Sequence, residues 1–324
     1  MTETVDVAVV QEPPVLLDRE ATLERVVRTV AETAADGAGL VVFPETYVPG
    51  YPVYVWRLTP GDPADHRLGH ELHRRLLEEA VDLEAGDLAP VVSAAREHGA
   101  TVVIGVHERD AAFSRGSLYN TQVTITPEAG IVNRHRKLVP THVERLVWAP
   151  GDAAGLQVID LGFGRLGGLI CWESYMPLAR FSLYAQGVQV YVASTWDEGD
   201  AWVATMRHIA REGRCWVIGS GCSMTAGDIP AGFPERERLF PDEEEWLNTG
   251  DSVIVAPDGS LVAGPLRREH GILRAVIDPG ATAAARYMLD AAGHYHRPDV
   301  FTLTVNRSAR SAIAFTDAGD NGMG

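Results

Sequence analysis

The sequence predicts a layered α/β protein in which two β-sheets pack face to face and helices lie outside them. Short β-branched runs alternate along the chain with longer stretches of helical spacing, which is typical of α/β layering. Several of the strands follow one another with few helices between them. Because parallel strands in one doubly wound sheet need crossover helices, two packed sheets fit this order better than one.

The chain begins with a strand, a helix and a second strand. Residues 5–10 (VDVAVV) are rich in valine and predict the first strand. Residues 18–35 carry apolar side chains at helical spacing, with Asp18 able to cap the start and Gly37 just after the end. Residues 40–43 are apolar throughout and predict a buried strand.

The second strand ends at a candidate catalytic carboxylate. Pro44 has no N–H and cannot continue the ladder, so Glu45 lies at the carboxyl end of the strand, where open α/β sheets place their sites. A carboxyl group in this position is partly desolvated, which raises its pKa toward the range of a general base. The alternative is an exposed glutamate that caps a loop.

The remaining elements continue the pattern. An acidic helical region is expected at 67–98, and helices at 175–186 and 200–213. Further strands are expected at 101–106, 120–126, 131–134, 166–170, 188–193, 216–219, 252–256 and 272–277. Residues 222–246 are rich in Gly, Pro and acids and predict a solvated loop or disorder, as does a flexible tail at 304–324 after a single domain at 1–303.

Composition and charge restrict the partners. The chain has 324 residues, 46% of them hydrophobic, and a formal net charge of -16. Nucleic-acid partners require clustered Lys and Arg, so the charge argues against them. The first residues are acidic where a signal peptide is basic, and no apolar run reaches roughly 18 residues. We expect a cytoplasmic protein with no nucleic-acid and no membrane partner.

The cysteines offer a candidate nucleophile. Cys171, Cys215 and Cys222 are odd in number and lack paired C-x-x-C spacing, so each should be a reduced thiol. An apolar strand runs into Cys171, and a helix is expected soon after it with Ser174 as N-cap. A thiol at such a bend faces a cleft, and the nearby helix N-terminus favours the thiolate. The alternative is a small buried hydrophobe, as expected for Cys215.

Lys137 is the third candidate. It lies in residues 134–141 (RHRKLVPT), between a predicted strand and a proline turn. Alone, this segment also fits a solvated basic turn.

Three separated motifs together resemble the nitrilase superfamily of carbon-nitrogen hydrolases. They are Phe43-Pro44-Glu45, residues 134–141 and Cys171-Trp172-Glu173, in the order of that family's Glu, Lys and Cys. The resemblance extends from residue 5 to about 303. A Met-Pro pair after Cys-Trp-Glu, residues 143–148 (VERLVW) and residues 293–301 (GHYHRPDVF) are similar to the nitrilase branch.

The resemblance implies a four-layer αββα sandwich, one carbon-nitrogen hydrolase domain, no metal and no organic cofactor. It also implies a mechanism for nitrile hydrolysis to a carboxylic acid and ammonia. Glu45 is the general base, Cys171 forms a thioimidate and then an acyl-thioester, and Lys137 with the Trp172 N–H faces the developing charge. Glu144 is expected to hold Lys137 or a water in register, or else to be an ordinary salt-bridge partner.

An aromatic pocket is expected for the nitrile. The candidates are Tyr51, Tyr54, Trp172 and Trp196, although aromatic side chains at such positions are more often packing residues. His294 and His296 indicate a metal site only weakly, because no third ligand is near them in the sequence.

Three other functions remain open at this stage. The same triad serves an amidase or carbamoylase, and a cyanide or nitrile hydratase would stop at the amide. A catalytically silent scaffold would lack Glu, Lys or Cys, and all three are present.

A homo-oligomer is also expected, at least a dimer and in the family often a larger spiral. The two predicted outer helices carry apolar side chains on more than one face, which pairing would bury. These side chains are Phe181, Leu183, Tyr184, Trp202, Val203 and Met206. Residues 222–246 and the segment beyond 303 are the candidates for a second contact.

Overall fold

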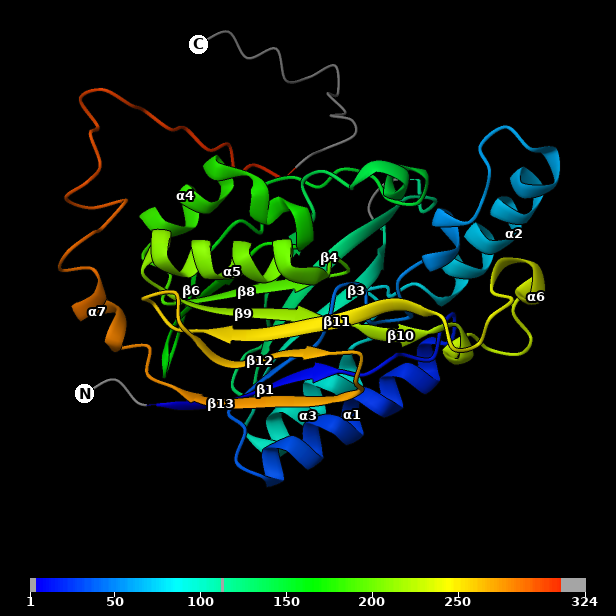
Figure 1. The fold of residues 1–324 in the computed structure, drawn as a ribbon, viewed down its shortest axis with the longest axis horizontal. Coiled ribbons are helices and arrows are strands. Elements are labelled where there is room, and N and C mark those ends of the chain that lie inside the picture. The colour runs from blue at the N-terminus through cyan, green and yellow to red at the C-terminus, as the bar shows by residue number, and fades with distance from the viewer. Residues whose placement is uncertain (1–3, 112–113, 310–324) are drawn as a thin grey trace, which may run out of the picture.

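A computed structural model describes residues 4–111 and 114–309, and two β-sheets form its centre (Figure 1). The first sheet has six strands in the order β13-β1-β2-β3-β4-β5. Their bounds are Gly271–Ile277 (β13), Val5–Gln11 (β1), Leu40–Val42 (β2), Thr101–Arg109 (β3), Leu118–Thr126 (β4) and Gly130–Arg136 (β5). β1, β2 and β3 are parallel, and the outer strands are antiparallel to their neighbours.

The second sheet has seven strands and a similar parallel centre. Its order is β10-β11-β9-β8-β7-β6, with β12 paired to β11. The bounds are Ser223–Thr225 (β10), Trp246–Val255 (β11), Trp216–Gly221 (β9), Val190–Thr195 (β8), Gly164–Gly168 (β7), Ile159–Leu161 (β6) and Leu261–Arg267 (β12). β7, β8 and β9 run parallel.

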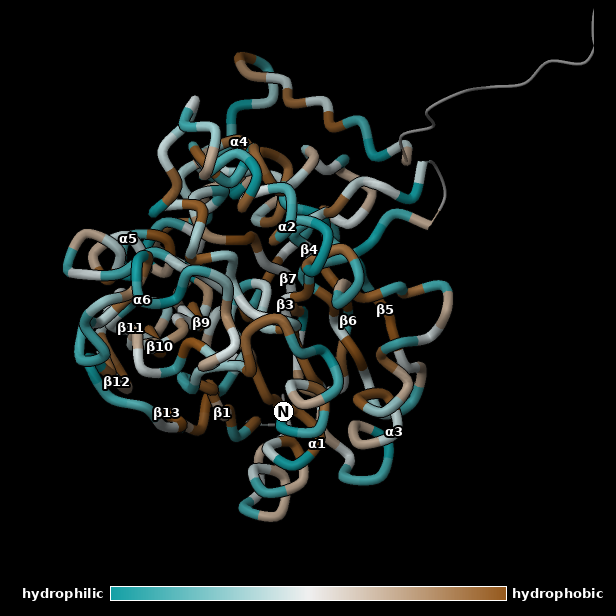
Figure 2. The backbone as a smooth tube through the Cα atoms, turned by 90° about the vertical axis from the view of Figure 1, so that its right-hand side faces the viewer, coloured by the Kyte–Doolittle hydropathy of each residue, from teal (hydrophilic) through white to brown (hydrophobic). Residues whose placement is uncertain are grey.

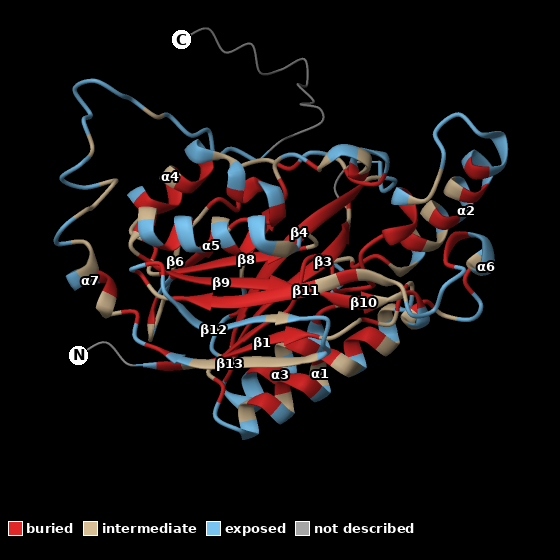
Figure 3. Ribbon diagram, viewed as in Figure 1, coloured by how far each residue is buried: buried red, intermediate tan, exposed pale blue. Residues whose placement is uncertain are grey.

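Helices cover the outer face of each sheet, which completes the αββα order expected from the sequence. The first sheet is covered by α1 (Arg19–Ala35) and α3 (Ala89–His98), and the second by α4 (Pro177–Ala185) and α5 (Gly199–Gly213) (Figure 1). The central strands are buried, whereas β12 is largely exposed and β13 is intermediate (Figure 3). The covering helices are buried on their inner side and exposed on their outer side (Figure 3). The smaller helices are α2 (Pro63–Glu79), α6 (Arg236–Leu239) and α7 (Ala281–Ala285).

Alternation along the strands explains why the layers form. On β1, Val7 and Val9 face the second sheet, whereas Ala8 and Val10 pack beneath the helices of the first sheet. β8 does the same, with Val190 and Val192 between the sheets. A strand buried on both faces, such as β2, can be hydrophobic throughout, and several interior segments of the tube are brown in Figure 2.

The sequence placed most elements correctly and some boundaries wrongly. The helical region expected at 67–98 is two helices, α2 and α3, with a turn between them that includes the bridge from Val81 to Glu108. Residues 222–246 hold β10, a 3₁₀ turn and α6, so they are not a bare loop. Of the tail expected at 304–324, residues 310–324 lie outside the described residues.

The apolar side chains offered as a dimer surface are mostly internal, and that argument was wrong. Leu183, Tyr184, Trp202, Val203 and Met206 belong to the core beneath α4 and α5. A helix that packs on a twisted sheet and on its neighbouring helix needs an apolar stripe wider than one contact face.

No helix within the described ranges is long and apolar enough to cross a membrane.

Candidate active site

Glu45 follows β2 and is almost completely buried, with 2% of its surface exposed. Three donors fix its carboxylate. Oε1 accepts from Lys137 Nζ at 2.7 Å and from Asn120 Nδ2 at 2.6 Å. Oε2 accepts from the backbone N–H of Trp196, the residue after β8, at 2.7 Å. The carboxyl ends of strands from both sheets therefore meet at this side chain, and strand ends of this kind are where α/β proteins place their sites.

The backbone around Glu45 is held closely against β3. Thr46 has φ +44°, in the left-handed region. Gly105, on β3, leaves the space for this turn: a Cβ there would lie 2.3 Å from Thr46 N and 2.4 Å from Pro44 O. The site thus depends on a glycine in the adjacent strand.

Lys137 lies between two carboxylates. It follows β5, is 1% exposed, and its Nζ donates to Glu45 and, at 2.8 Å, to Glu144 Oε2. Its backbone N–H donates to Asn120 O at 2.7 Å, which ties it to β4. The solvated basic turn is excluded by this burial.

Glu144 is fixed in turn by the 3₁₀ helix η2 (His142–Leu146). Its Oε2 also accepts from the Thr141 N–H at 2.6 Å, and Oε1 accepts from Tyr51 OH at 2.9 Å. Glu144 therefore contacts Lys137 directly, as the sequence suggested.

Cys171 opens the 3₁₀ helix η3 (Cys171–Tyr175) and is buried. Its φ of +53° is left-handed, a conformation that costs of order 1–3 kcal/mol and persists where the surroundings impose it. Gly168, at the end of β7, allows the approach to β8, because a Cβ there would lie 2.2 Å from Val192 O. The helix α4 starts only at Pro177, and Ser174 contacts Tyr191 OH at 3.1 Å instead of capping it.

The direction of the pKa shift of Cys171 favours a protonated thiol in the site. Burial raises the pKa of Cys171, and nearby Glu45 raises it further, which Lys137 only partly offsets. The expected lowering by a helix N-terminus is therefore wrong, because desolvation outweighs it. Burial likewise raises the pKa of Glu45. Burial opposes the charge on Lys137, but Glu45, Cys171 and Glu144 raise its pKa above the ordinary value.

The four aromatic candidates lie in different surroundings. Tyr51 and Trp196 stack on each other at 4.3 Å beside Glu144 and Glu45. Trp172 is 52% exposed, and its Nε1 donates to Asp197 Oδ2 at 3.0 Å. Tyr54 is buried, packs near Phe233, and lines a separate cavity of about 620 Å³ against α2.

Two contacts of the site were not expected from the sequence. Asn120, on β4, donates to Glu45, and the Thr195 side chain, at the end of β8, lies close enough to Cys171 to lower the pKa of its thiol. A buried polar side chain at a strand end is the signal that could have revealed both, but it appears only once burial is known.

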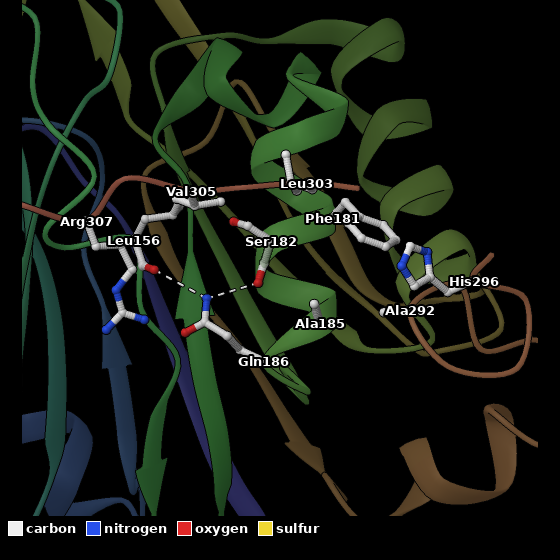
Figure 4. Close-up of a pocket in the computed structure, with 10 residues that line it drawn as sticks. All are labelled: Leu156, Phe181, Ser182, Ala185, Gln186, Ala292, His296, Leu303, Val305 and Arg307. Carbon is white, nitrogen blue, oxygen red and sulfur yellow. Dashed lines mark hydrogen bonds between the residues drawn. The ribbon is translucent and has the colours of Figure 1, made fainter. Parts of the chain in front are cut away.

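The carboxyl-terminal histidines lie away from this cluster. His296 packs on Phe181 of α4 at a ring distance of 5.0 Å. His296 and Phe181 line a cavity of about 340 Å³, and the chain at Leu303 and Val305 covers it (Figure 4). Within residues 4–111 and 114–309, no three His, Cys, Asp or Glu side chains are grouped to bind a metal ion.

The arrangement combines the groups that covalent catalysis needs. A buried carboxylate can take a thiol proton, a buried cation can face negative charge, and a thiol sits within electrostatic reach of both.

Comparison with known proteins gives consistent matches. The family model for carbon-nitrogen hydrolase matches residues 6–287. An aliphatic nitrilase of Sinorhizobium fredii is 40% identical, over 94% of this chain and 97% of the relative. A bifunctional nitrilase/nitrile hydratase of Nicotiana tabacum is 36% identical, over 97% and 90%. The crystal structure of an amidase from Nesterenkonia sp. superposes with a TM-score of 0.64 at 17% identity, over 89% and 96%.

Proposed function

Because this chain belongs to the carbon-nitrogen hydrolase family, we propose that it is a nitrilase that converts an organic nitrile to a carboxylic acid and ammonia. The observation that carries the proposal is the buried Glu45–Lys137–Glu144 network beside the Cys171 thiol. The sequence identity of this chain to relatives named as nitrilases supports a nitrile, and not an amide, as the substrate. The likeness to an amidase structure concerns the fold alone.

The proposed first half-reaction forms a thioimidate. Glu45 takes the thiol proton while the Cys171 sulfur attacks the nitrile carbon, and the proton passes to the nitrile nitrogen. This route suits a thiol with a raised pKa, because the thiolate exists only as the bond forms. Lys137 and the Trp172 N–H stabilise the charge that develops on nitrogen.

The second half-reaction consumes two waters. Glu45 activates the first, which adds to the thioimidate carbon; the C–N bond then breaks and ammonia leaves with a proton from Glu45 or Lys137. The acyl-thioester that remains is hydrolysed by the second water, which releases the acid and the thiol. Glu144 keeps Lys137 in place throughout.

A panel of aliphatic, arylaliphatic and aromatic nitriles tests the proposal. We expect ammonia and acid in equal amounts from at least one nitrile, no turnover by Cys171→Ala, and a covalent adduct on Cys171 in the mass spectrum of wild-type protein quenched during turnover. Faster hydrolysis of the matching amides than of any nitrile would make the protein an amidase. Turnover without an adduct would remove Cys171 as the nucleophile.

A nitrile hydratase activity is the second candidate, favoured by the relative named for both reactions. The two differ in which bond of the tetrahedral intermediate breaks: loss of the thiol gives the amide, and loss of ammonia gives the thioester. Chromatography of the products distinguishes them, and amide as the main product from several nitriles would move the assignment to hydratase.

A further inference from the structure

We propose that Glu173 is a positioning residue that holds the Cys171 turn against the Lys137 segment. Its Oε2 accepts from the backbone N–H of Ile170 at 2.8 Å, and its Oε1 accepts from the N–H of Leu138 at 2.6 Å. Ile170 immediately precedes the nucleophile, and Leu138 immediately follows the lysine. One carboxylate therefore joins the two segments that must meet; the inference rests on the catalytic roles proposed above.

The carboxylate is ionised and fully enclosed. Glu173 is 1% exposed, and His135 Nε2 donates to Oε2 at 3.0 Å. Burial alone would raise the pKa of Glu173, but His135 and the two backbone N–H groups outweigh it and hold the pKa below its ordinary value. All three donors thus favour the charged, acceptor-only form, which can accept at both oxygens at once.

The geometry of the turn explains why a positioning residue is needed there. Cys171 adopts φ +53°, a strained conformation that its surroundings must impose. Glu173 N also donates to Ile170 O at 3.1 Å, so the turn closes on itself while the side chain anchors it to the neighbouring segment. Catalytic groups must be held within about 0.5 Å of productive geometry, and a 1 Å displacement can cost roughly 100-fold in rate.

A different role for Glu173 would be a buried ion pair with His135 that only stabilises the fold. The two roles separate by variant. Glu173→Gln keeps the shape but offers one oxygen for two backbone donors, so one N–H loses its acceptor. His135→Gln removes the ring partner and leaves both backbone hydrogen bonds in place.

The experiment compares these variants with Asp65→Asn as a matched control. Asp65 is also a buried carboxylate that accepts a backbone N–H, from Thr59 at 2.8 Å, and pairs with Arg238, but it lies on α2 and joins neither segment. The readouts are kcat and KM for a nitrile and the rate of Cys171 alkylation by iodoacetamide from pH 5 to 10, followed by intact mass and normalised to folded protein by circular dichroism.

For Glu173→Gln we expect kcat and the alkylation rate to fall roughly 10–100-fold and KM to change within about threefold, because the thiol loses alignment with Glu45 and Lys137. His135→Gln and Asp65→Asn should each remain within about fivefold of wild type. Equal losses in Glu173→Gln and His135→Gln, or normal alkylation in Glu173→Gln, would overturn the proposal.

Two further outcomes are kept distinct. If Glu173→Gln does not fold, Glu173→Asp supplies the same test, because its side chain is shorter by about 1.5 Å and keeps its charge. Slow alkylation of folded Glu173→Asp supports the positioning role of Glu173, and a wild-type alkylation rate overturns it. If the wild type hydrolyses no nitrile, the nitrilase proposal fails alone, because alkylation still measures how Cys171 is positioned.

Discussion

Glu45 works at the point where three donors from two sheets converge on one carboxylate. Lys137, Asn120 and the Trp196 N–H all donate to it, and burial raises its pKa. Burial also raises the pKa of the thiol beside it, which favours the protonated thiol in the resting site. The proposed mechanism therefore begins with proton transfer to Glu45 and needs no preformed thiolate.

Replacement of the base or the cation should abolish most activity. Glu45→Gln removes the proton acceptor, and Lys137→Ala leaves the developing nitrogen charge unopposed, so each should reduce kcat by roughly 100-fold or more. Steady-state ammonia release measures both. Activity of Glu45→Gln within tenfold of wild type would exclude Glu45 as the base.

The pH dependence should move in a defined direction when Glu144 is neutralised. Glu45 must be ionised to accept the proton, and burial raises its pKa above the ordinary 4.5, so kcat/KM should fall in an acid limb above pH 4.5. The negative charge of Glu144 contributes to that rise. Glu144→Gln should therefore shift the acid limb to lower pH, whatever happens to the maximal rate.

A pH–rate profile of kcat/KM from pH 4 to 10 makes the measurement. Lys137 should keep its charge over this range because its pKa is raised. An acid limb that stays in place or moves to higher pH in Glu144→Gln would contradict the assignment of that limb to Glu45.

The residue types of the site could be predicted from sequence, but not all of its surroundings. Pro44 stops the strand before Glu45, and the order of three motifs identified Lys137 and Cys171. The partners of these groups come from distant strands, so Asn120 and Thr195 could not be placed. Among the aromatic candidates, spacing could not distinguish the enclosed Tyr51 from Tyr54, which faces α2.

At the scale of elements, periodicity predicted type and failed at boundaries. The helix at Arg19–Ala35 and the strand at Gly271–Ile277 lie within a residue of expectation, because caps and β-branched runs are local signals. The split of 67–98 into α2 and α3 was missed, since the backbone between them is fixed by hydrogen bonds between Val81 and β3. Tertiary pairing of that kind leaves no mark on local periodicity.

The contact between β2 and β3 should be intolerant of one added methyl group. Gly105→Ala would place a Cβ against the backbone of Pro44 and Thr46, so we expect a loss of about 1–3 kcal/mol in unfolding free energy and a fall in kcat, because Glu45 must shift. Denaturant unfolding and steady-state kinetics measure the two effects.

Gly69→Ala is the matched control. This glycine lies within α2, where a Cβ would meet only Leu58 Cδ1 at 3.6 Å, an ordinary contact. Alanine in a helix interior should stabilise by about 0.5–1 kcal/mol. Equal stability of the two variants would show that the β2–β3 approach is not tight.

At the scale of the whole molecule, the exposed apolar surface supports a dimer on grounds other than those first given. Large hydrophobic side chains remain exposed on η3 and α4 and along the chain after α7. They are Trp172, Tyr175, Leu178, Tyr287, Met288, Tyr295, Val300 and Phe301. Large apolar side chains left exposed on neighbouring segments are candidates for a protein–protein interface.

We therefore predict a homo-oligomer of at least two chains at micromolar concentration. Light scattering coupled to size exclusion measures its mass, and a value near 35.1 kDa would contradict the prediction. Leu178→Glu, at 67% exposure, should weaken the assembly by placing a charge in its interface. Deletion of residues 304–324 tests the tail separately: an unchanged large assembly would show that the tail does not extend it.

The pairing of β1 with β13 joins the beginning of the described chain to its last strand. Val5 lies opposite Ile277, so the first sheet closes only after nearly the whole chain has left the ribosome. The strands of the second sheet, which cover the inner faces of β1 and β2, span residues 159–267, and nascent chains whose apolar faces are not yet covered are prone to aggregate. Glu45 emerges early in translation and Cys171 later, so the two can lie in one site only after the chain up to at least Trp196, whose N–H donates to Glu45, has been made.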